Sequence, residues 1–373
     1  MNENIRTRIA LSLVPNIGAH KARKLMDFVD IPTDVFRLSG SDLSSIRGIG
    51  QQSIDGILKF DAWNEVDRII RKSESMGLGL IIPEDTTYSE HLRQIADPPI
   101  LLWYKGNVDL LNSAGIAVVG TRYPSGYGKD MTRDFTSELV RHGFTINSGL
   151  ARGVDSIAHK TALDHQGGTI AVLGSGIDRI YPMENTPLAD RIVQEGGLLV
   201  SEYPPGTKPD YQNFPTRNRI VSGLSVGILV IETKVTGGSM ITARLGLEQN
   251  REIFVIPHAL TNPRGSGSHM LIRESSGKLV ENVHDIISEF SWFESQAETV
   301  TTPPIDLEKI RSTLSLQADN LFEIMKDLKM VHFDDLLNLT QMTHSILNAS
   351  LLELELAGVI RSVPGKQYQI SQF

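Results

Sequence analysis

The hydrophobic pattern of the chain changes at about residue 115. Beyond that point, short runs of consecutive apolar residues alternate with longer segments of helical periodicity. Continuous apolar runs are typical of parallel strands that are covered on both faces, and their alternation with helices is typical of an α/β fold. The pattern predicts parallel strands at 116–119, 144–147, 169–173, 198–201, 227–231 and 253–256.

The first 60 residues have a helical pattern with two similar turns. The turns have the sequences Pro-Asn-Ile-Gly at 15–18 and Ile-Arg-Gly-Ile-Gly at 46–50. Paired turns of this kind resemble helix–hairpin–helix modules, whose turn amides can face a DNA phosphate. A small helical bundle, in which the glycines only cap helices, explains the same pattern equally well. We therefore predict a small helical domain at 1–65, of a helix–hairpin–helix or SAM-like type, and leave its role open.

The last 80 residues contain a polar break and then a third pattern. Periodicity is lost at 291–306, which predicts a linker. Three helices and a hairpin with a Pro-Gly turn follow at 307–373, which is the element order of a winged helix. The expected recognition helix at 343–355 has two acids and no lysine or arginine, so it would repel a DNA phosphate. We expect this domain to contact protein rather than DNA.

Composition excludes several classes of site. The length of 373 residues fits two or three domains. The chain has no cysteine, which removes disulfides, thiolate zinc sites and cysteine nucleophiles and fits a cytoplasmic location. No apolar run reaches the roughly 18–20 residues of a membrane helix, and the N-terminus lacks the features of a signal peptide. We expect no membrane, metal or cofactor to be involved.

The net charge of −8 restricts where a polyanion could bind. It argues against binding over the whole surface. It leaves room for a local basic groove, because distant exposed charges are screened over about 8 Å at physiological salt. A nucleic-acid site must therefore lie in particular loops.

Candidate anion-binding chemistry lies in loops that follow the predicted strands. These loops, at 120–122, 148–155, 174–179 and 236–239, combine glycines, hydroxyls and charged residues. Ligands of open α/β sheets bind beyond the carboxyl ends of the strands, where all of these loops belong. Helix N-termini supply unpaired N–H groups there, and arginine binds phosphate through two hydrogen bonds. The pattern indicates phosphate recognition.

Residues 213–243 concentrate this chemistry. We predict a polar turn at 215–220 that exposes Arg217 and Arg219, then the strand at 227–231 and a helix opened by 236–243. We expect an Arg217→Ala, Arg219→Ala variant to fold normally and to lose most of its affinity for single-stranded DNA.

The loops also permit other interpretations. The GxGxxG spacing is missing, which disfavours a nicotinamide or flavin site. Asp155 could cap its helix while Arg152 pairs with it, and we expect Arg152 to combine this role with anion binding. The histidines, His159 among them, have no metal-ligand spacing, and we expect them to be structural.

Six motifs occur in an order that is specific for one family: 120–128, 148–159, 168–185, 201–206, 213–225 and 237–243. On these motifs the chain resembles the DNA-processing protein A family, also called DprA or Smf. The resemblance runs through 75–290. It implies an extended Rossmann-like domain, which we place at 66–290, between the N-terminal helical domain and the winged helix.

The resemblance also implies a function. It suggests a protein that binds and protects single-stranded DNA, helps to load the RecA recombinase in natural transformation or recombination, and forms a homodimer. Stacking on Phe214 should supplement the phosphate contacts, as aromatic side chains do in many single-strand binders. The predicted DNA-binding residues are Gly120, Arg122, Ser148, Gly149, Arg152, Phe214, Arg217, Asn218, Arg219, Gly237, Gly238, Ser239 and Thr242.

The alternative from another class is an enzyme. Rossmann-like nucleoside-monophosphate phosphoribohydrolases use a Pro-Gly-Gly-x-Gly-Thr-x-x-Glu motif on a similar sheet. This chain has the glycines at 237–238, but Ala243 and Arg244 stand where the catalytic glutamate is expected. The sequence therefore predicts a binding protein without a catalytic residue.

Overall fold

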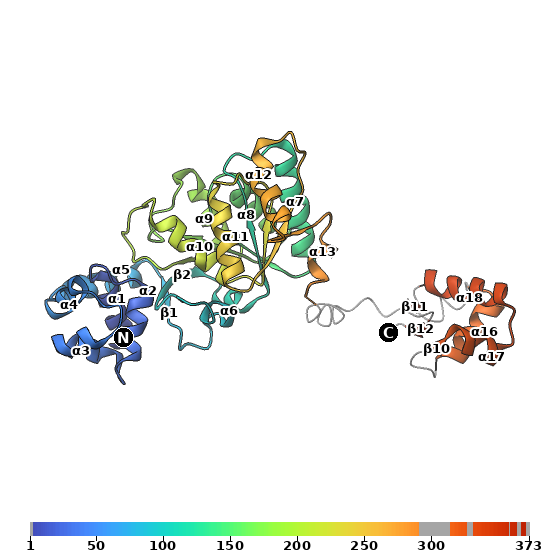
Figure 1. The fold of residues 1–373 in the computed structure, drawn as a ribbon, viewed down its shortest axis with the longest axis horizontal. Coiled ribbons are helices and arrows are strands. Elements are labelled where there is room, and N and C mark those ends of the chain that lie inside the picture. Colours follow the sequence, from blue (N-terminus) through green and yellow to red (C-terminus); the bar gives the residue numbers. More distant parts are fainter. Residues whose placement is uncertain (1–2, 291–313, 327–330, 358, 364–366, 371–373) are drawn as a thin grey trace. The chain divides into compact units, whose positions relative to one another are not determined.

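The computed structural model describes residues 3–290, 314–326, 331–357, 359–363 and 367–370 (Figure 1). Contacts divide the chain into two compact units, Met1–Glu294 and Ser295–Phe373. The predicted linker at 291–306 lies outside the described residues. Within the described residues, no helix is long and apolar enough to cross a bilayer.

The first unit is built on a nine-stranded sheet with the order β1-β2-β6-β5-β4-β3-β7-β8-β9. Strands β3 to β9 are parallel, whereas β1 and β2 form an antiparallel edge beside β6. All six predicted strands are confirmed to within one residue at each end. The bounds are β1 Gly79–Ile81, β2 Leu102–Gly106, β3 Gly115–Val119, β4 Thr145–Ser148, β5 Thr169–Leu173, β6 Leu198–Ser201, β7 Gly227–Val230, β8 Glu252–Val255 and β9 Lys278–Leu279.

The strand order contains a point where the direction of winding reverses. From β3 the chain adds β4, β5 and β6 on one side, and then returns to place β7 on the other side of β3. In the register, Ile116 of β3 pairs with Ile146 of β4 on one flank and with Gly227 of β7 on the other. The crevice beyond the carboxyl ends of strands at such a switch point is the usual ligand site of this architecture.

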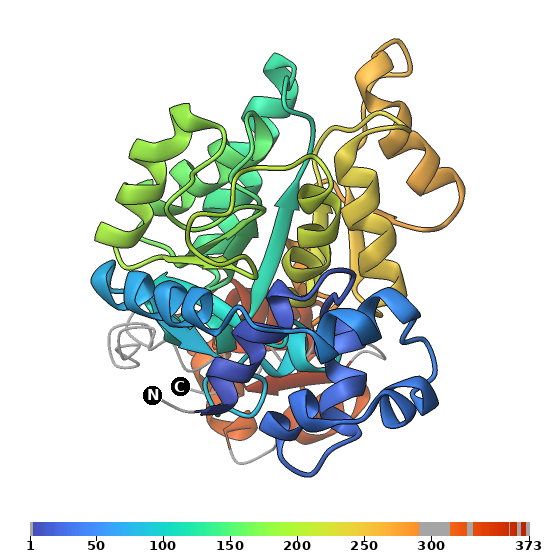
Figure 2. The same ribbon diagram turned by 90° about the vertical axis from the view of Figure 1, so that its left-hand side faces the viewer.

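Helices cover both faces of the sheet (Figure 2). Ile116 and Val118 pack with residues of α7 and α8, whereas Ala117 and Val119 pack with residues of α10 and α11, as the alternation of side chains along a strand requires. Burial on both faces explains why these strands are continuously apolar. The helices of this region are α6 Glu90–Arg93, α7 Gly126–Arg141, α8 Val154–Asp164, α9 Thr186–Gln194, α10 Asn213–Gly223, α11 Gly238–Glu248, α12 Ser266–Arg273 and α13 His284–Ile287.

The N-terminal helices share a hydrophobic core with the sheet. Ile9, Leu25 and Val66 belong to the same buried cluster as Leu173 and Leu199 of strands β5 and β6. The boundary predicted near residue 65 therefore does not coincide with a division between compact units. Both predicted glycine turns are present, and each ends at the N-cap of a helix. The helices are α1 Glu3–Leu13, α2 Ala19–Asp27, α3 Gly40–Ser45, α4 Gln51–Leu58 and α5 Trp63–Ser75.

The second unit has the predicted helices and hairpin and its own core, which includes Leu321, Leu336 and Leu347. Its strands form a sheet of order β10-β12-β11. One acid of the expected recognition helix is structural, because the Glu353 carboxylate accepts the N–H and hydroxyl of Ser315, both at 2.6 Å. The elements are α16 Leu316–Met325, β10 Val331–His332, α17 Phe333–Thr340, α18 His344–Leu356, β11 Ile360–Val363 and β12 Gln367–Ile370.

His159 is buried in α8 as a neutral imidazole. Its Nδ1 lies 2.7 Å from the Thr169 hydroxyl, and that hydroxyl donates to the Ile146 carbonyl at 2.8 Å. The imidazole must therefore donate through Nδ1–H, which leaves Nε2 buried and without a partner in the described part of the chain. Burial lowers the pKa of His159 to about 3. The expectation that this histidine is structural agrees with its position.

Protonation of His159 should destabilise the fold in acid. The unfolded chain, with a histidine pKa of about 6.5, binds this proton between about pH 6.5 and pH 3 while the folded chain does not. Stability from this group is thus complete above pH 6.5 and falls by about 1.4 kcal/mol per pH unit below it. A His159→Asn variant should lack that slope in urea unfolding between pH 4 and 6. Identical pH dependence in both proteins would contradict the assignment.

Candidate nucleic-acid interface

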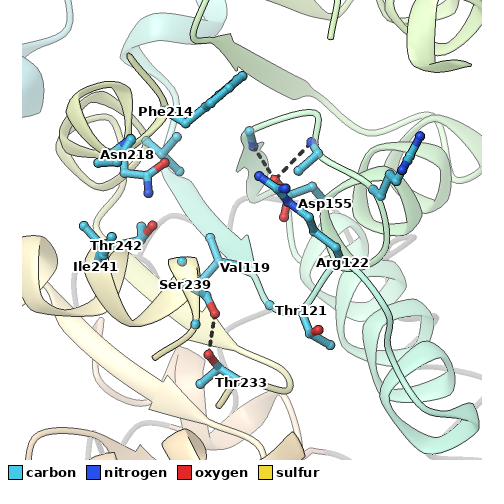
Figure 3. Close-up of a pocket in the computed structure, with 18 of the residues that line it drawn as sticks. Val119, Thr121, Arg122, Asp155, Phe214, Asn218, Thr233, Ser239, Ile241 and Thr242 are labelled. Atoms are coloured by element: carbon cyan, nitrogen blue, oxygen red, sulfur yellow. Dashed lines mark hydrogen bonds between the residues drawn. The ribbon is translucent and has the colours of Figure 1, made fainter. Parts of the chain in front are cut away.

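A cavity of about 720 Å³ opens beyond the carboxyl ends of β3, β4 and β7, at the switch point of the sheet (Figure 3). Its walls come from the loops that follow β3, β4, β5, β6 and β7, from α10 and from the first turns of α8 and α11. Eleven of the thirteen predicted DNA-binding residues line it. They are Gly120, Arg122, Gly149, Arg152, Phe214, Arg217, Asn218, Gly237, Gly238, Ser239 and Thr242.

Hydrogen bonds to Glu232, a buried residue that follows β7, fix the loop after β3. The Glu232 carbonyl accepts the Thr121 N–H at 2.7 Å, and its carboxylate accepts the Ser125 N–H at 2.8 Å and the Asn262 amide at 3.0 Å. This leaves Arg122 exposed at the rim. Among the residues that the structure describes, Arg122 has no salt-bridge partner. It is a cation available to a ligand.

The loop after β4 is organised around the buried carboxylate of Asp155. The carboxylate accepts the N–H groups of Gly149 at 3.1 Å and of Ala151 at 3.3 Å (Figure 3). Burial raises the pKa of Asp155, and the nearby Arg217 opposes that rise. The Asp155 carboxylate therefore holds the conformation of the loop after β4. The predicted pairing of Arg152 with Asp155 is wrong, because Arg152 instead forms two hydrogen bonds with Glu184, at 2.8 and 2.7 Å.

Residues 215–220 are not the polar turn that the sequence predicted. They lie inside α10, whose residues from Arg217 to Gly223 pack against the sheet with only Asn218 less than fully buried. Arg217 lies at the base of the cavity and donates to the carbonyls of Gly149, at 2.8 Å, and Val172. Burial lowers the pKa of Arg217 to about 10, so the guanidinium stays charged at neutral pH. It contributes a fixed positive charge beneath the cavity rather than a mobile contact.

Two predicted residues are not brought to the cavity. Arg219 points to the other side of α10, where it is buried and forms ion pairs with Glu202, at 2.6 Å, and Asp97, at 3.2 Å. The helical conformation explains this, since residues two apart in a helix face different directions. Ser148 is also buried, and its hydroxyl donates to the Val118 carbonyl at 2.7 Å. The expectation that Arg219 is an exposed contact is wrong.

The N-terminus of α11 forms the opposite wall. Gly237 is the N-cap, and its N–H donates to the Lys234 carbonyl at 2.8 Å. The Ser239 hydroxyl donates to Thr233 at 2.7 Å, which holds the first turn in place (Figure 3). The N–H groups of the first turn of a helix have no intrahelical acceptors, and the helix dipole is positive there. A Cβ atom added at Gly238 would meet nothing within 4 Å, so the space before these amides is open.

Aromatic side chains line one end of the cavity. The rings of Phe214 and Tyr181 lie 5.4 Å apart between centroids, and Tyr123 and Tyr211 are largely exposed. Sequence reasoning did not predict a role for Tyr211 or for Lys234, an exposed cation of the lining. Lys234 could have been found from its position in the loop between β7 and the glycines. Tyr211 carries no motif that would have marked it.

The arrangement suits a phosphorylated polymer. Backbone amides, three arginines and a lysine surround an open cavity, and aromatic faces lie next to them. The amides and cations can bind phosphates, and the aromatic rings can stack on bases. Neither kind of contact depends on the base sequence.

Comparisons with known proteins agree with this geometry. The family model for DNA recombination-mediator protein A matches residues 79–291, and the model for the DprA winged helix domain matches 308–366. Protein Smf of Synechocystis sp. is 30% identical over 396 residues, which cover 97% of each chain. The chain belongs to the DprA/Smf family.

Solved structures of the family have the same fold. The structure of DprA from Streptococcus pneumoniae superposes with a TM-score of 0.67 at 32% identity, covering 78% of this chain and 98% of that one. The structure of DprA from Helicobacter pylori, described in terms of its single-stranded DNA binding mode, gives a TM-score of 0.52 at 30% identity. It covers 57% of this chain and 94% of the other. The predicted Rossmann-like fold with a C-terminal winged helix is confirmed.

Proposed function

We propose that this protein binds single-stranded DNA in the cavity at the switch point of its sheet, as a DprA/Smf protein acting in DNA recombination and uptake. The observation that carries the proposal is the convergence of Arg122, Arg217, Lys234 and the α11 amides on one open cavity. The Helicobacter pylori relative, described as a single-stranded DNA binder, supports the choice of ligand. The strand is bound through phosphates, so we expect little sequence preference.

The cavity favours binding over catalysis. A phosphoribohydrolase needs a carboxylate that is free to act on the ribose, and Ala243 and Arg244 occupy the positions where the related motif has glutamate. Asp155 does line the cavity, but its carboxylate is occupied by two backbone amides and faces Arg217. We therefore propose that the protein is not an enzyme.

Loading of RecA and self-association are further parts of the proposal. Membership in the DprA/Smf family supports both. A RecA filament should form faster on single strands coated with single-strand-binding protein when this protein is present. Light scattering should give twice the mass of one chain.

The phosphate contact of Arg122 can be measured through its salt dependence. An Arg122→Gln variant should bind a fluorescent single strand several-fold more weakly, and the slope of log K against log salt should fall by about 0.7, the value for one phosphate contact on a single strand. Arg133→Gln is the matched control, because Arg133 is an exposed arginine of α7 outside the cavity. An unchanged slope for Arg122→Gln would contradict the contact.

The same protein should release no free base from AMP. Base release at a rate that tracks protein concentration, and that disappears in Asp155→Asn, would favour the hydrolase instead.

A further inference from the structure

A second cavity, of about 400 Å³, lies between helix α5 and the loops that follow β5 and β6. Its wall contains three cations, Arg68, Lys72 and Arg179, and one carboxylate, Glu65. Glu65 pairs with Arg68 and Asp178 pairs with Lys72, so the three cations exceed these two carboxylates by one charge, in a chain whose net charge is −8. The cations come from two distant parts of the sequence, so the fold brings them together.

The second cavity adjoins the first along two separate loops. On the loop after β5, Arg179 lines the second cavity and Tyr181 lines the first. On the loop after β6, Thr207 lines the second cavity and Pro209 lines the first. Two residues span at most about 7 Å, so the linings of the two cavities lie close together along both loops. Lys208 lies exposed between them on the second loop.

Lys72 is a fixed part of the wall. Its Nζ lies 2.7 Å from Oδ2 of Asp178, and Oδ1 of the same carboxylate accepts the Gly206 N–H at 2.7 Å. Gly206 has a φ of +101°, and a Cβ atom there would lie 3.2 Å from the Lys72 ammonium. The Asp178 carboxylate thus connects the lysine to the turn at Gly206.

The other two cations can exchange their partners for a ligand. Arg68 pairs with Glu65 on the exposed surface of α5, where ion pairs contribute little to stability. Arg179 is half exposed, and its contact with Asp178 is long, at 4.0 Å. A phosphate would give Arg179 a shorter, charge-assisted hydrogen bond, and it could replace Glu65 as the acceptor for Arg68.

We propose that this second cavity binds the phosphodiester backbone of the same DNA strand after it leaves the first cavity. The inference rests on the proposed function and adds a second subsite to it. It also gives helix α5 and the N-terminal helices a role, because they supply one wall of the path. The closeness of the two cavities along both loops favours the DNA strand over an acidic protein segment, which is a separate outcome of the test.

The test compares short and long strands. Anisotropy titrations with four-nucleotide and twenty-nucleotide oligothymidylates would be made on the full chain and on an Arg68→Gln, Arg179→Gln double variant. The control is Arg133→Gln, Arg141→Gln, which removes two exposed arginines that form similar i,i+3 pairs on α7 and line neither cavity. Both double variants change the net charge equally.

The cavity variant should bind the long strand about tenfold more weakly than the control near 0.1 M salt, with a salt slope lower by about 1.4, or two contacts of about 0.7 each. Its affinity for the short strand should match the control. An unchanged affinity for the long strand would overturn the second subsite alone, and would leave the cavity to an acidic protein. An equal loss for both strands would also overturn it. Failure of the unaltered protein to bind either strand would overturn the proposed function itself.

Discussion

A Gly238→Asp substitution should reduce single-strand affinity by roughly a hundredfold or more while leaving the fold intact. The new carboxylate would occupy the open space before the α11 amides, where the account places a phosphate. Like charges about 4 Å apart repel each other by on the order of 4 kcal/mol at an effective dielectric constant of about 20. An acid at the first position of a helix favours folding, because it faces the positive end of the helix dipole.

The chain offers a close control for this substitution. Gly126 is also the first residue of a helix, α7, and a Cβ atom there would also meet nothing within 4 Å. It does not line the cavity. Gly126→Asp should therefore bind single strands like the unaltered protein, and neither variant should have a lowered unfolding midpoint in urea. Equal loss of binding in the two variants would show that added charge, rather than its position, is responsible.

Replacing Arg217 with methionine should destabilise the protein by about 3–5 kcal/mol. The substitution leaves the buried carboxylate of Asp155 without its neighbouring charge, and leaves the carbonyls of Gly149 and Val172 without this donor. Urea unfolding followed by tryptophan fluorescence would measure the loss, since Trp103 is buried in the first unit. Any loss of DNA binding in this variant would thus be inseparable from loss of structure.

A double variant separates the charge pair from simple packing. Asp155→Asn removes the negative charge but keeps an oxygen that can accept the Gly149 and Ala151 amides. In Asp155→Asn, Arg217→Met, the destabilisation should be smaller than the sum of the two single effects by at least about 1 kcal/mol, as for other residues of one hydrogen-bond network, since both side chains bond to Gly149. Strict additivity would contradict the coupling between these side chains.

The sheet could be predicted from the sequence because burial on both faces makes each parallel strand a continuous apolar run. The residues after the strands could be predicted as well, since parallel strands place their carboxyl ends at one edge. Gly120, Gly149 and Gly238 are therefore where the sequence predicted them, at the cavity.

The orientation of the arginines could not be predicted in the same way. The segment at 213–223 contains proline, asparagine and two arginines, which favours a turn by composition, but packing against the sheet makes it a helix. That helix sends Arg217 under the cavity and Arg219 to its partners Glu202 and Asp97. Asp97 and Glu202 lie in other segments of the sequence, outside the motif that contains the arginines. Only the tertiary fold shows that they form ion pairs with Arg219. The core that the N-terminal helices share with the sheet could not be predicted either, because it is formed by tertiary contacts between segments that are far apart in the sequence.

Hydrogen exchange of the full chain, with and without a twenty-nucleotide single strand, tests the central claim most directly. We expect slower amide exchange in peptides that cover 120–123, 149–152 and 237–242, because these segments meet the phosphates. Peptides from the winged helix, 344–356, should be unchanged. Protection confined to 344–356, with 237–242 exchanging as in the free protein, would contradict it.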